Sequence, residues 1–418
     1  MPTDTFRAEV DVLVVGAGPG GSAAAFHLAS HGLDVLMVER SSFPREKACG
    51  DGLTPRGVKQ IQAMGMDPLG PGFERINGLR VYHYHEPILL MPWPDLNDYP
   101  AFGVVRTRSD FDQALAEHAV SAGARLWQRT EAVAPVVEAG WVTGAVLKSA
   151  DEDGEPFRVR AKLVIAADGA ASRFGSAAGI RRDPARPIGI AARRYYRTDR
   201  NLGPWMESWL EVAENGKMMP GYGWVFPVSE GVVNVGAGLQ NTFKGFKDVS
   251  ARSVFEAFMK MLPPAWEIDE EHAMGPLLSG PIPMGMNRHP AALPGLLLVG
   301  DAAGMVNPFN GEGIAFAMES GRLAADLAYG SLSSGRSALA QAYPTALKEQ
   351  YGKYFAAGRF FVKLIGNPEV MRLSTKYGLP REGFMKFLLR VMAGLSDGRE
   401  GDRQDRMIHA IKQLVPAA

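Results

Sequence analysis

The sequence predicts an α/β protein made of a parallel-sheet domain, an antiparallel-sheet domain inserted into it, and a C-terminal helical region. Three observations support this. The chain opens with an apolar run, a glycine-rich turn and a helical stretch. The same sequence pattern returns near residue 296, and the residues after about 341 have a helical pattern. With 418 residues, the chain is long enough for two or more domains.

The opening of the chain has the pattern strand, glycine turn, helix, strand. Residues 11–15 and 35–39 are apolar runs typical of buried strands, and residues 20–31 form a helix of small residues between them. Two parallel strands joined by a helix form a βαβ unit. Further along, residues 110–122 predict a helix and residues 161–167 another apolar strand.

The glycine turn fits the GxGxxG pattern of a Rossmann-type dinucleotide-binding fold. Gly16 permits the tight turn, Gly18 lets the backbone approach a pyrophosphate, and Gly21 allows close packing of helix on strand. The helix that follows directs free N–H groups at the phosphates. Glu39, at the end of the next strand, can accept hydrogen bonds from ribose hydroxyls. By itself, this motif does not separate FAD from NAD.

A second glycine–acid motif lies far along the chain. Asp301, in the stretch GDAAG, follows the apolar strand 296–299, where a carboxylate suits hydrogen bonding to a polyol such as ribitol. The segment 307–314 then opens a small-residue helix at 315–323, whose N-terminus would stabilise negative charge on a reduced flavin. The two motifs together favour FAD as the cofactor.

Between these motifs the sequence pattern changes. From about residue 180 to 283, short alternating strands, aromatic residues and prolines predict an antiparallel sheet. The predicted boundaries place 1–75, 101–180 and 284–340 in a discontinuous FAD-binding domain, 76–100 and 181–283 in a substrate-binding sheet domain, and 341–418 in the C-terminal helical region.

Composition narrows the function. Lys plus Arg and Asp plus Glu each number 45, so the formal net charge is zero and no nucleic-acid partner is expected. The single cysteine, Cys49, excludes an internal disulfide and suits a reducing compartment. No apolar run reaches the roughly 18 residues of a spanning helix, and the N-terminus lacks a signal-peptide core. We expect a cytoplasmic protein, either soluble or attached peripherally to the inner face of the cell membrane.

The order of the motifs resembles a flavoprotein group typified by aromatic hydroxylases. In that group GxGxxG lies near the N-terminus, DG in the middle, here at 168–169, and GD towards the C-terminus, here at 300–301. Arg106, ahead of the helix that contains Asp110 and Asp112, belongs to the same order. Taken alone, the DG pair is a turn and the Arg106 stretch is a solvated helix start.

Within that group, the chain is most similar to the geranylgeranyl reductase family. The residues that carry the likeness are KACGDGLT at 47–54 and GYGWVFP at 221–227, followed by NVG at 234–236. The second segment looks like the family's YxWxFP segment, which lies in the substrate cavity. The resemblance covers most of residues 10–323 and is weak after about residue 341. The string ACGDGLTPR is most similar to the bacterial branch that includes menaquinone reductase.

The resemblance implies an FAD-dependent reductase that saturates isoprenoid double bonds, in prenyl diphosphates, archaeal-type lipids, chlorophyll precursors or menaquinone side chains. A prenylated lipid or quinone would then be its partner. Carried over residue by residue, the family pattern implies FAD contacts at Pro19, Gly20, Glu39, Ala48, Cys49, Gly50, Arg106, Asp301, Gly313 and Ile314, and substrate contacts at Tyr222, Trp224 and Phe226.

The chemistry of such a substrate suggests roles for the aromatic residues. An isolated alkene is a poor hydride acceptor, so hydride delivery must accompany or follow protonation of the other carbon, which leaves positive charge on a tertiary carbon. The rings of Tyr222, Trp224 and Phe226 could bury the chain and soften that charge. We predict catalytic roles for Tyr222, Trp224 and Cys49. The alternative for the aromatic residues is an ordinary sheet core, and the alternative for Cys49 is a small buried hydrophobic residue.

Two other functions stay open on this scaffold. A monooxygenase or halogenase is one, because residues 221–227 differ from a halogenase GWxWxIP segment by Tyr222 for Trp and Phe226 for Ile. A non-enzymatic flavin-containing lipid or quinone binder is the other. The electron donor is also open, since Gly236-Ala237-Gly238 lacks the strand–helix setting of a nicotinamide site and fits a strand turn better.

Two further segments have alternative readings. His83 and His85 alternate on a predicted strand without the acidic or Cys partners of a metal site, so we expect no metal. Residues 354–395 mix large apolar residues with Lys and Arg. A basic amphipathic helix of this kind can lie in a membrane interface or cap a substrate cavity.

Overall fold

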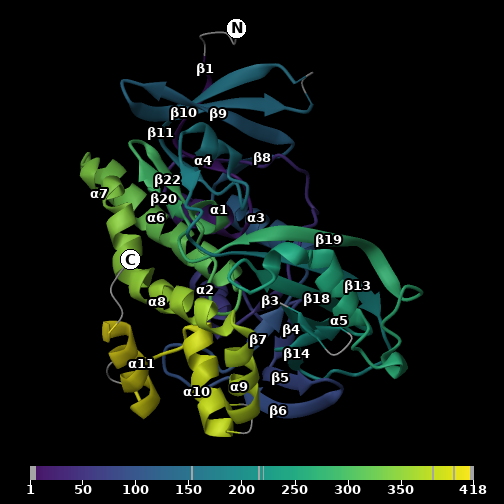
Figure 1. The fold of residues 1–418 in the computed structure, drawn as a ribbon. Helices are drawn as coiled ribbons and strands as arrows, with labels where there is room; N and C mark the ends of the chain where they lie inside the picture. Colours follow the sequence, from purple (N-terminus) through teal and green to yellow (C-terminus); the bar gives the residue numbers. More distant parts are fainter. Residues whose placement is uncertain are drawn as a thin grey trace.

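The computed structural model describes residues 6–151, 154–214, 217–219, 221–378, 381–398 and 401–414. Figure 1 shows two sheet regions, one above the other, with helices of the C-terminal region along one side and across the lower end. Among the described residues, no helix combines the length and the apolar character that crossing a membrane requires.

The upper sheet is built on a parallel core. Its strands run in the order β22, β11, β1, β2, β8, with β21 pairing antiparallel to β22 and the hairpin β9–β10 extending the sheet from β11. The bounds are β1 (Phe6–Val15), β2 (Val35–Val38), β8 (Arg125–Trp127), β9 (Thr130–Glu138), β10 (Trp141–Ser149), β11 (Pro156–Ala166), β21 (Ala292–Leu293) and β22 (Leu296–Leu298).

Helices cover this sheet because its strands are apolar on both faces. All four residues of β2 and the last four of β1 are buried, and they pack in one core with α1 (Pro19–Ser30), α3 (Arg108–Ser121) and α6 (Ile314–Ser334). The predicted elements are confirmed here with shifted ends. The first strand begins at Phe6, and the helix expected at 315–323 continues to Ser334.

The lower sheet has seven strands, in the order β19, β13, β18, β17, β14, β5, β6. It is antiparallel except between β14 and β5, which run parallel. The bounds are β5 (Gly78–His83), β6 (Glu86–Pro92), β13 (Ile188–Arg197), β14 (Trp205–Trp209), β17 (Tyr222–Ser229), β18 (Val232–Gln240) and β19 (Ala273–Pro283). Strands from 76–100 thus pair with strands from 181–283, although the division into domains stays a prediction.

One face of the lower sheet is closed by α5 (Ala251–Met259), a helix that the sequence reading missed. Val225, Val235 and Ala237 point to this face and pack with α5 in one apolar core. Gly223 lets the helix come close, because a Cβ at this residue would lie 2.4 Å from the Phe258 ring. The opposite face is therefore the one that can meet the upper part of the molecule.

Three short strands and a helix link the strands of the two sheets along the chain. The first of these strands directly follows the segment 45–51, which contributes to the candidate site. β3 (Gly52–Leu53) pairs with β7 (Gly103–Val105), which pairs with β4 (Glu74–Ile76), and α2 (Pro55–Ala63) follows β3. The remaining short elements are α4 (Arg173–Ala177), β12 (Arg181–Arg182), β15 (Val212–Glu214), β16 (Lys217–Met219) and β20 (Arg288–His289).

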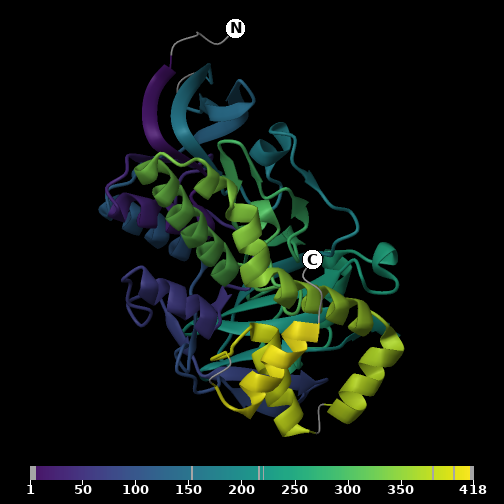
Figure 2. The ribbon, with the colours of Figure 1, turned by 90° about the vertical axis from the view of Figure 1, so that its left-hand side faces the viewer.

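The helical C-terminal region is confirmed. It consists of α7 (Ala338–Gln341), α8 (Tyr343–Ile365), α9 (Pro368–Gly378), α10 (Glu382–Ala393) and α11 (Arg403–Leu414), and Figure 2 shows α8 running from the upper to the lower part of the molecule. Met385 and Leu389 of α10 pack with Phe226 and Met206 of the lower sheet.

Two local readings of the sequence were wrong. Gly236 and Gly238, read as part of a strand turn, lie inside β18. His85 lies beyond the end of β5, which ends at His83. Glycines usually weaken a strand interior, so the pattern suggested a turn; the structure shows that rings on the next strand occupy the space of the missing side chains.

Candidate active site

The ends of four neighbouring strands bring the predicted motifs together. β2, β1, β11 and β22 lie side by side and parallel, and within two residues of their ends come Glu39, Gly16, Asp168 and Gly300. The carboxyl ends of parallel strands meet at one edge of a sheet, where such folds bind their ligands. Motifs that are far apart in the sequence therefore share one edge.

The glycine turn after β1 fits a pyrophosphate. Gly16 has φ +98°, and a Cβ there would lie 2.5 Å from the Ala167 carbonyl oxygen. A Cβ on Gly21 would lie 1.9 Å from the Gly16 carbonyl oxygen, so helix and turn pack without space for a side chain. A Cβ on Gly18, by contrast, would meet only a guanidinium nitrogen of Arg45, at 3.5 Å. The turn thus leaves an open backbone surface with a cation above it.

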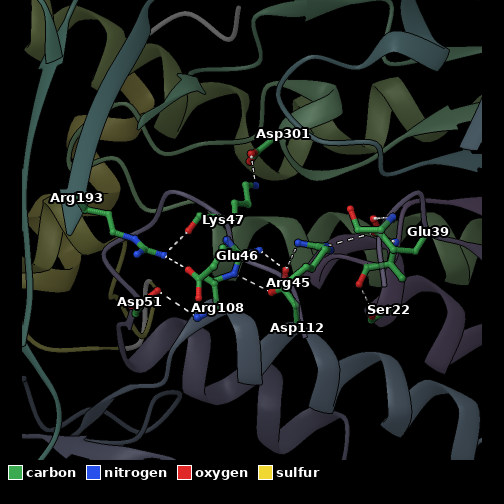
Figure 3. A network of polar contacts seen from close by, with 12 residues as sticks. Ser22, Glu39, Arg45, Glu46, Lys47, Asp51, Arg108, Asp112, Arg193 and Asp301 are labelled. Carbon is green, nitrogen blue, oxygen red and sulfur yellow. Dashed lines mark hydrogen bonds and ion pairs between the residues drawn. The ribbon is translucent and has the colours of Figure 1, made fainter. Parts of the chain in front are cut away.

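Glu39 is held at the strand end by groups from both sides. Its side chain is buried, accepts a hydrogen bond from the Ala17 N–H at 3.2 Å and lies 3.4 Å from Arg45. Arg45 is fixed in turn by buried Asp112 at 3.0 Å, which also accepts two hydrogen bonds from Arg108. Figure 3 shows this row of charges leading from Glu39 to α3. The carboxylate is therefore oriented where a ribose is expected.

The second acid, Asp301, is joined to the same stretch of chain. Lys47 Nζ lies 2.9 Å from Asp301 Oδ2, as Figure 3 shows. Asp301 also lies beside the start of α6, because a Cβ on Gly313 would be 3.5 Å from Asp301 Oδ1. Ile314 is the first residue of that helix. Residues 45–47 therefore contact both acidic corners and link them.

The three predicted substrate residues lie in a row on β17. A Cβ on Gly50 would lie 3.2 Å from the Phe226 ring and 3.4 Å from Trp224 Nε1. At the other end of the row, a Cβ on Gly311 would lie 3.1 Å from the Tyr222 hydroxyl oxygen. The row thus reaches from the segment before β3 to the loop before α6, the two segments predicted to flank the flavin.

Glycines on β18 hold the aromatic row against the sheet. Tyr222 pairs with Gly238 and Trp224 with Gly236. A Cβ on Gly236 would lie 2.1 Å from the Trp224 ring, and one on Gly238 would lie 3.1 Å from the Tyr222 ring. Paired residues of neighbouring strands point to the same face, so these rings lie over backbone that carries no side chain.

Cys49 lies where the predicted flavin and substrate sides meet. The Asp51 N–H donates to its Sγ at 3.4 Å, and the Arg108 guanidinium lies beside it. Burial and, to a smaller extent, the nearby Cys49 raise the pKa of Tyr222 to about 12. Tyr222 therefore stays a neutral phenol near neutral pH and can donate a hydrogen bond. Ala48 touches β19, since a Cβ on Gly280 would lie 3.4 Å from the Ala48 Cβ.

Arg106 is placed differently from the other predicted residues. Its guanidinium pairs with Asp110 and lies 4.6 Å from the Phe73 ring centre. Its backbone N–H donates to the Asp51 carbonyl at 3.2 Å. None of these contacts joins its side chain to the Glu39 or Asp301 corner, and its contact with FAD stays a prediction.

The sequence analysis assigned no role to several polar residues of the site. Asp51, Tyr195 and Asn234 form hydrogen bonds between the two sheet regions, and Arg45 and Asp112 form an ion pair within the FAD-binding part. Asp112 was read as part of a solvated helix start, yet it is fully buried. Its signal was the spacing from Arg108, because residues four apart share one helix face.

The described residues contain no group of three or more His, Cys, Asp or Glu side chains that could hold a metal ion. His83 instead lies 3.7 Å from Glu211.

Asp168, of the DG pair at 168–169, accepts a hydrogen bond from the Phe174 N–H at 2.8 Å, and burial raises its pKa. Its position against the Gly16 turn explains its place in the motif order.

The fold and the paired glycine–acid corners define an FAD-binding flavoprotein. Residues 9–221 match the family described as FAD binding domain. A menaquinone reductase from Mycolicibacterium smegmatis is 36% identical over 94% of this chain and 93% of its own length. A digeranylgeranylglycerophospholipid reductase from Thermoplasma acidophilum is 34% identical over 82% and 84% of the two chains.

A solved structure agrees with these relatives. The geranylgeranyl bacteriochlorophyll reductase-like protein of Thermoplasma acidophilum superposes with a TM-score of 0.75 at 27% identity, over 92% of this chain and 99% of the other. The chain belongs to the geranylgeranyl reductase family of FAD-dependent oxidoreductases.

Proposed function

We propose that this enzyme saturates a C=C bond in an isoprenoid chain, and that its substrate is the prenyl side chain of menaquinone or a geranylgeranyl lipid. The observation that carries the proposal is the aromatic row on β17, which reaches from Gly50 to Gly311 between the two segments predicted to flank the flavin. Relatives named for prenylated substrates support the same conclusion.

The proposed cofactor contacts follow the strand edge. Gly16, Gly18, Pro19 and Gly20 would face the pyrophosphate, with the Arg45 guanidinium placed to pair with it. Glu39 would bind ribose and Asp301 ribitol. A further group would lie at the isoalloxazine: Ala48, Cys49, Gly50, Arg106, Gly313 and Ile314. Reduced FAD would supply the hydride.

The residues of the chain itself would bind and shield the prenyl chain. Each buried CH₂ contributes roughly 0.8 kcal/mol, so one isoprene unit contributes about 3–4 kcal/mol before ordering costs. The faces of Trp224 and Phe226 suit both that burial and a carbon that gains positive charge. The Tyr222 phenol and the Cys49 thiol, which lies near enough to raise the pKa of Tyr222, are the proposed groups that hold a proton near the reacting carbon.

The test is an anaerobic incubation of FAD-loaded, dithionite-reduced enzyme with menaquinone and with geranylgeranyl lipids, followed by mass spectrometry. We expect a mass gain of one H₂ per reduced bond, and a loss of this product in Trp224→Leu while FAD stays bound. Unchanged prenyl masses with every substrate would leave a non-enzymatic binder. Hydroxylated or halogenated products in the presence of O₂, without H₂ addition, would favour the monooxygenase or halogenase.

The proposal includes peripheral contact with an anionic membrane through the helices at the lower end of the molecule (Figure 1). Phe360 of α8, Tyr377 of α9 and Phe384 of α10 are 69%, 52% and 49% exposed. Lys363 of α8 is also exposed, and Lys386 of α10 is half-buried. Large apolar residues with cations nearby suit a membrane interface, and a membrane is where a prenylated quinone would be found.

Vesicle sedimentation tests this contact. Binding to vesicles that contain phosphatidylglycerol should fall in Phe360→Ser/Phe384→Ser, because the apolar area that inserts is lost. Val137→Ser is the matched control, since Val137 is 55% exposed but lies on β9 at the opposite end of the molecule. Equal binding by all three proteins would refute the membrane contact and leave the reductase proposal intact.

A further inference from the structure

Asp51 is a buried carboxylate at the junction of the two sheet regions. It has no exposed surface and a backbone φ of +67°, a conformation that side chains other than glycine, Asn and Asp rarely adopt. It lies between Gly50, which touches the aromatic row, and β3. A charged residue at such a position costs free energy unless its partners are complete.

Donors from three different elements complete those partners. Asp51 Oδ2 accepts from the Tyr195 hydroxyl at 2.6 Å and from Asn234 Nδ2 at 2.7 Å. Asp51 Oδ1 accepts from the Arg108 N–H at 3.3 Å. These donors belong to β13, β18 and α3. The carboxylate is therefore the point where two strands of the lower sheet meet the first turn of a helix of the FAD-binding part.

Asn234 transmits this arrangement to the aromatic row. Its Nδ2 donates to Asp51 and to the Cys49 carbonyl at 2.8 Å, so both amide hydrogens are used. Its Oδ1 must then face the other way, where it accepts from Trp224 Nε1 at 3.0 Å. The Trp224 ring is thus positioned from two sides, by Asn234 at its nitrogen edge and by Gly236 beneath it.

We propose that Asp51 is a positioning residue, which acts through Asn234 to hold the Trp224 indole in the orientation that receives the prenyl chain. This inference rests on the proposed function, since it assigns Trp224 to the prenyl substrate. It goes beyond that function, because Asp51 need not contact FAD or substrate. Its effect should appear in substrate binding and not in FAD binding.

The variant Asp51→Asn tests the role with the smallest change in volume. An Asn can adopt the same φ, but it offers one acceptor oxygen in place of two. In one orientation the new side-chain NH₂ faces the Arg108 N–H. In the other orientation it faces the Nδ2 of Asn234 and forces that side chain to turn. Both arrangements remove a hydrogen bond to a charged group and leave two donors facing each other.

The primary readout is the change in the absorption spectrum of the oxidised flavin when a prenyl substrate is added, which reports binding without turnover. We expect Asp51→Asn to weaken prenyl binding by about 10-fold to 100-fold, the equivalent of one lost hydrogen bond to a charged group. FAD affinity, followed by flavin fluorescence, should change less than about threefold. Asp67→Asn, an exposed Asp in a local turn, is the matched control and should behave as the wild type.

A second variant keeps the test informative if Asp51→Asn folds poorly. Asn234→Ala cuts the same path at the next residue, and the double variant should be no weaker in prenyl binding than the worse single variant, since residues of one path are not additive. Wild-type prenyl binding by Asp51→Asn, or equal losses of FAD and prenyl affinity, would overturn the positioning role. A wild type that gives no spectral response to any prenyl substrate would instead remove the proposed function itself.

Discussion

The two sheets use burial in opposite ways. In the upper sheet, β1, β2 and β22 bury apolar side chains on both faces, and the charged groups gather at the strand ends. In the lower sheet, charged and polar residues are buried within the strands themselves, among them Arg193, Glu207 and Asn234. The upper sheet is thus a scaffold for the loops that carry the candidate cofactor-binding residues, whereas one face of the lower sheet is itself part of the candidate site.

The glycines of the two sheets show the same contrast. Gly16 and Gly21 are required because backbone packs on backbone at the turn. Gly236 is required because an aromatic ring lies on the strand. The first kind recurs in a fixed spacing and forms a motif, while the second kind is understood only when the neighbouring strand is known.

The largest expected effect concerns Glu207, which is buried on the α5 side of the lower sheet. Its carboxylate pairs with Arg200 at 2.6 Å and Arg80 at 2.7 Å and accepts from the Tyr82 hydroxyl at 3.1 Å. Glu207→Gln removes the charge at a fully buried position and leaves two half-buried guanidinium groups without it. We expect the free energy of unfolding to fall by about 3–5 kcal/mol, measured by urea denaturation.

The control for this prediction is Glu214→Gln in the exposed Glu214–Lys260 pair, whose change should stay within about 0.5 kcal/mol. Folded Glu207→Gln should still bind FAD like the wild type, because Glu207 lies on the face away from the cofactor corners. A loss of FAD affinity in the folded variant would show that the two sheets are not separable in this way.

The next effect is a pH dependence that Asp51 gives to stability. Burial raises the pKa of Asp51 to about 6, against the hydrogen bond from Tyr195 and the charges of Arg193 and Arg108, which lower it. The unfolded chain releases the proton first, near its ordinary pKa of about 4. The stabilising contribution is thus complete below about pH 4 and is lost as the pH rises to about 6, by roughly 3 kcal/mol in all.

Asp51→Asn isolates this contribution. The difference in the free energy of unfolding between wild type and variant should fall as the pH rises from about 4 to about 6, and then stay constant. The groups that face Asp51 keep their charge over this range: Arg193 of β13 and Arg108 of α3 stay cationic, and the pKa of Tyr195 is raised. A difference that does not vary with pH would mean that Asp51 has an ordinary pKa.

The sequence predicted the upper sheet and its cofactor better than the lower sheet and its buried network. Gly16, Glu39 and Asp301 belong to patterns that depend on local spacing, and the order of the strands then places them at one edge. Tyr195 carries no such local signal, and the NVG stretch that contains Asn234 gives this residue no role. They face Asp51 only because β13 and β18 pair in one register, in which Tyr195 lies opposite Asn234. A single sequence without contacts does not specify that register.

The smallest expected effects separate the two kinds of glycine. In Gly236→Ala the new Cβ would lie 2.1 Å from the Trp224 ring, which must move, and overpacking of this kind costs about 1–3 kcal/mol. We expect this variant to bind FAD normally, to lose prenyl affinity and to melt a few degrees lower. In Gly21→Ala the clash is with the Gly16 carbonyl, 1.9 Å away, so FAD affinity should fall instead.

Gly383→Ala is the control for both variants, because a Cβ on this helical residue meets no atom within 4 Å. Ala also favours a helix over Gly by about 1 kcal/mol, so this protein should be as stable as the wild type or more stable. Titrations with FAD and with a prenyl substrate then give the answer. If Gly21→Ala and Gly236→Ala weakened the binding of the same ligand, the strand ends of the upper sheet and the aromatic row on β17 would not bind separate ligands. The contrast between the two sheets would then not hold.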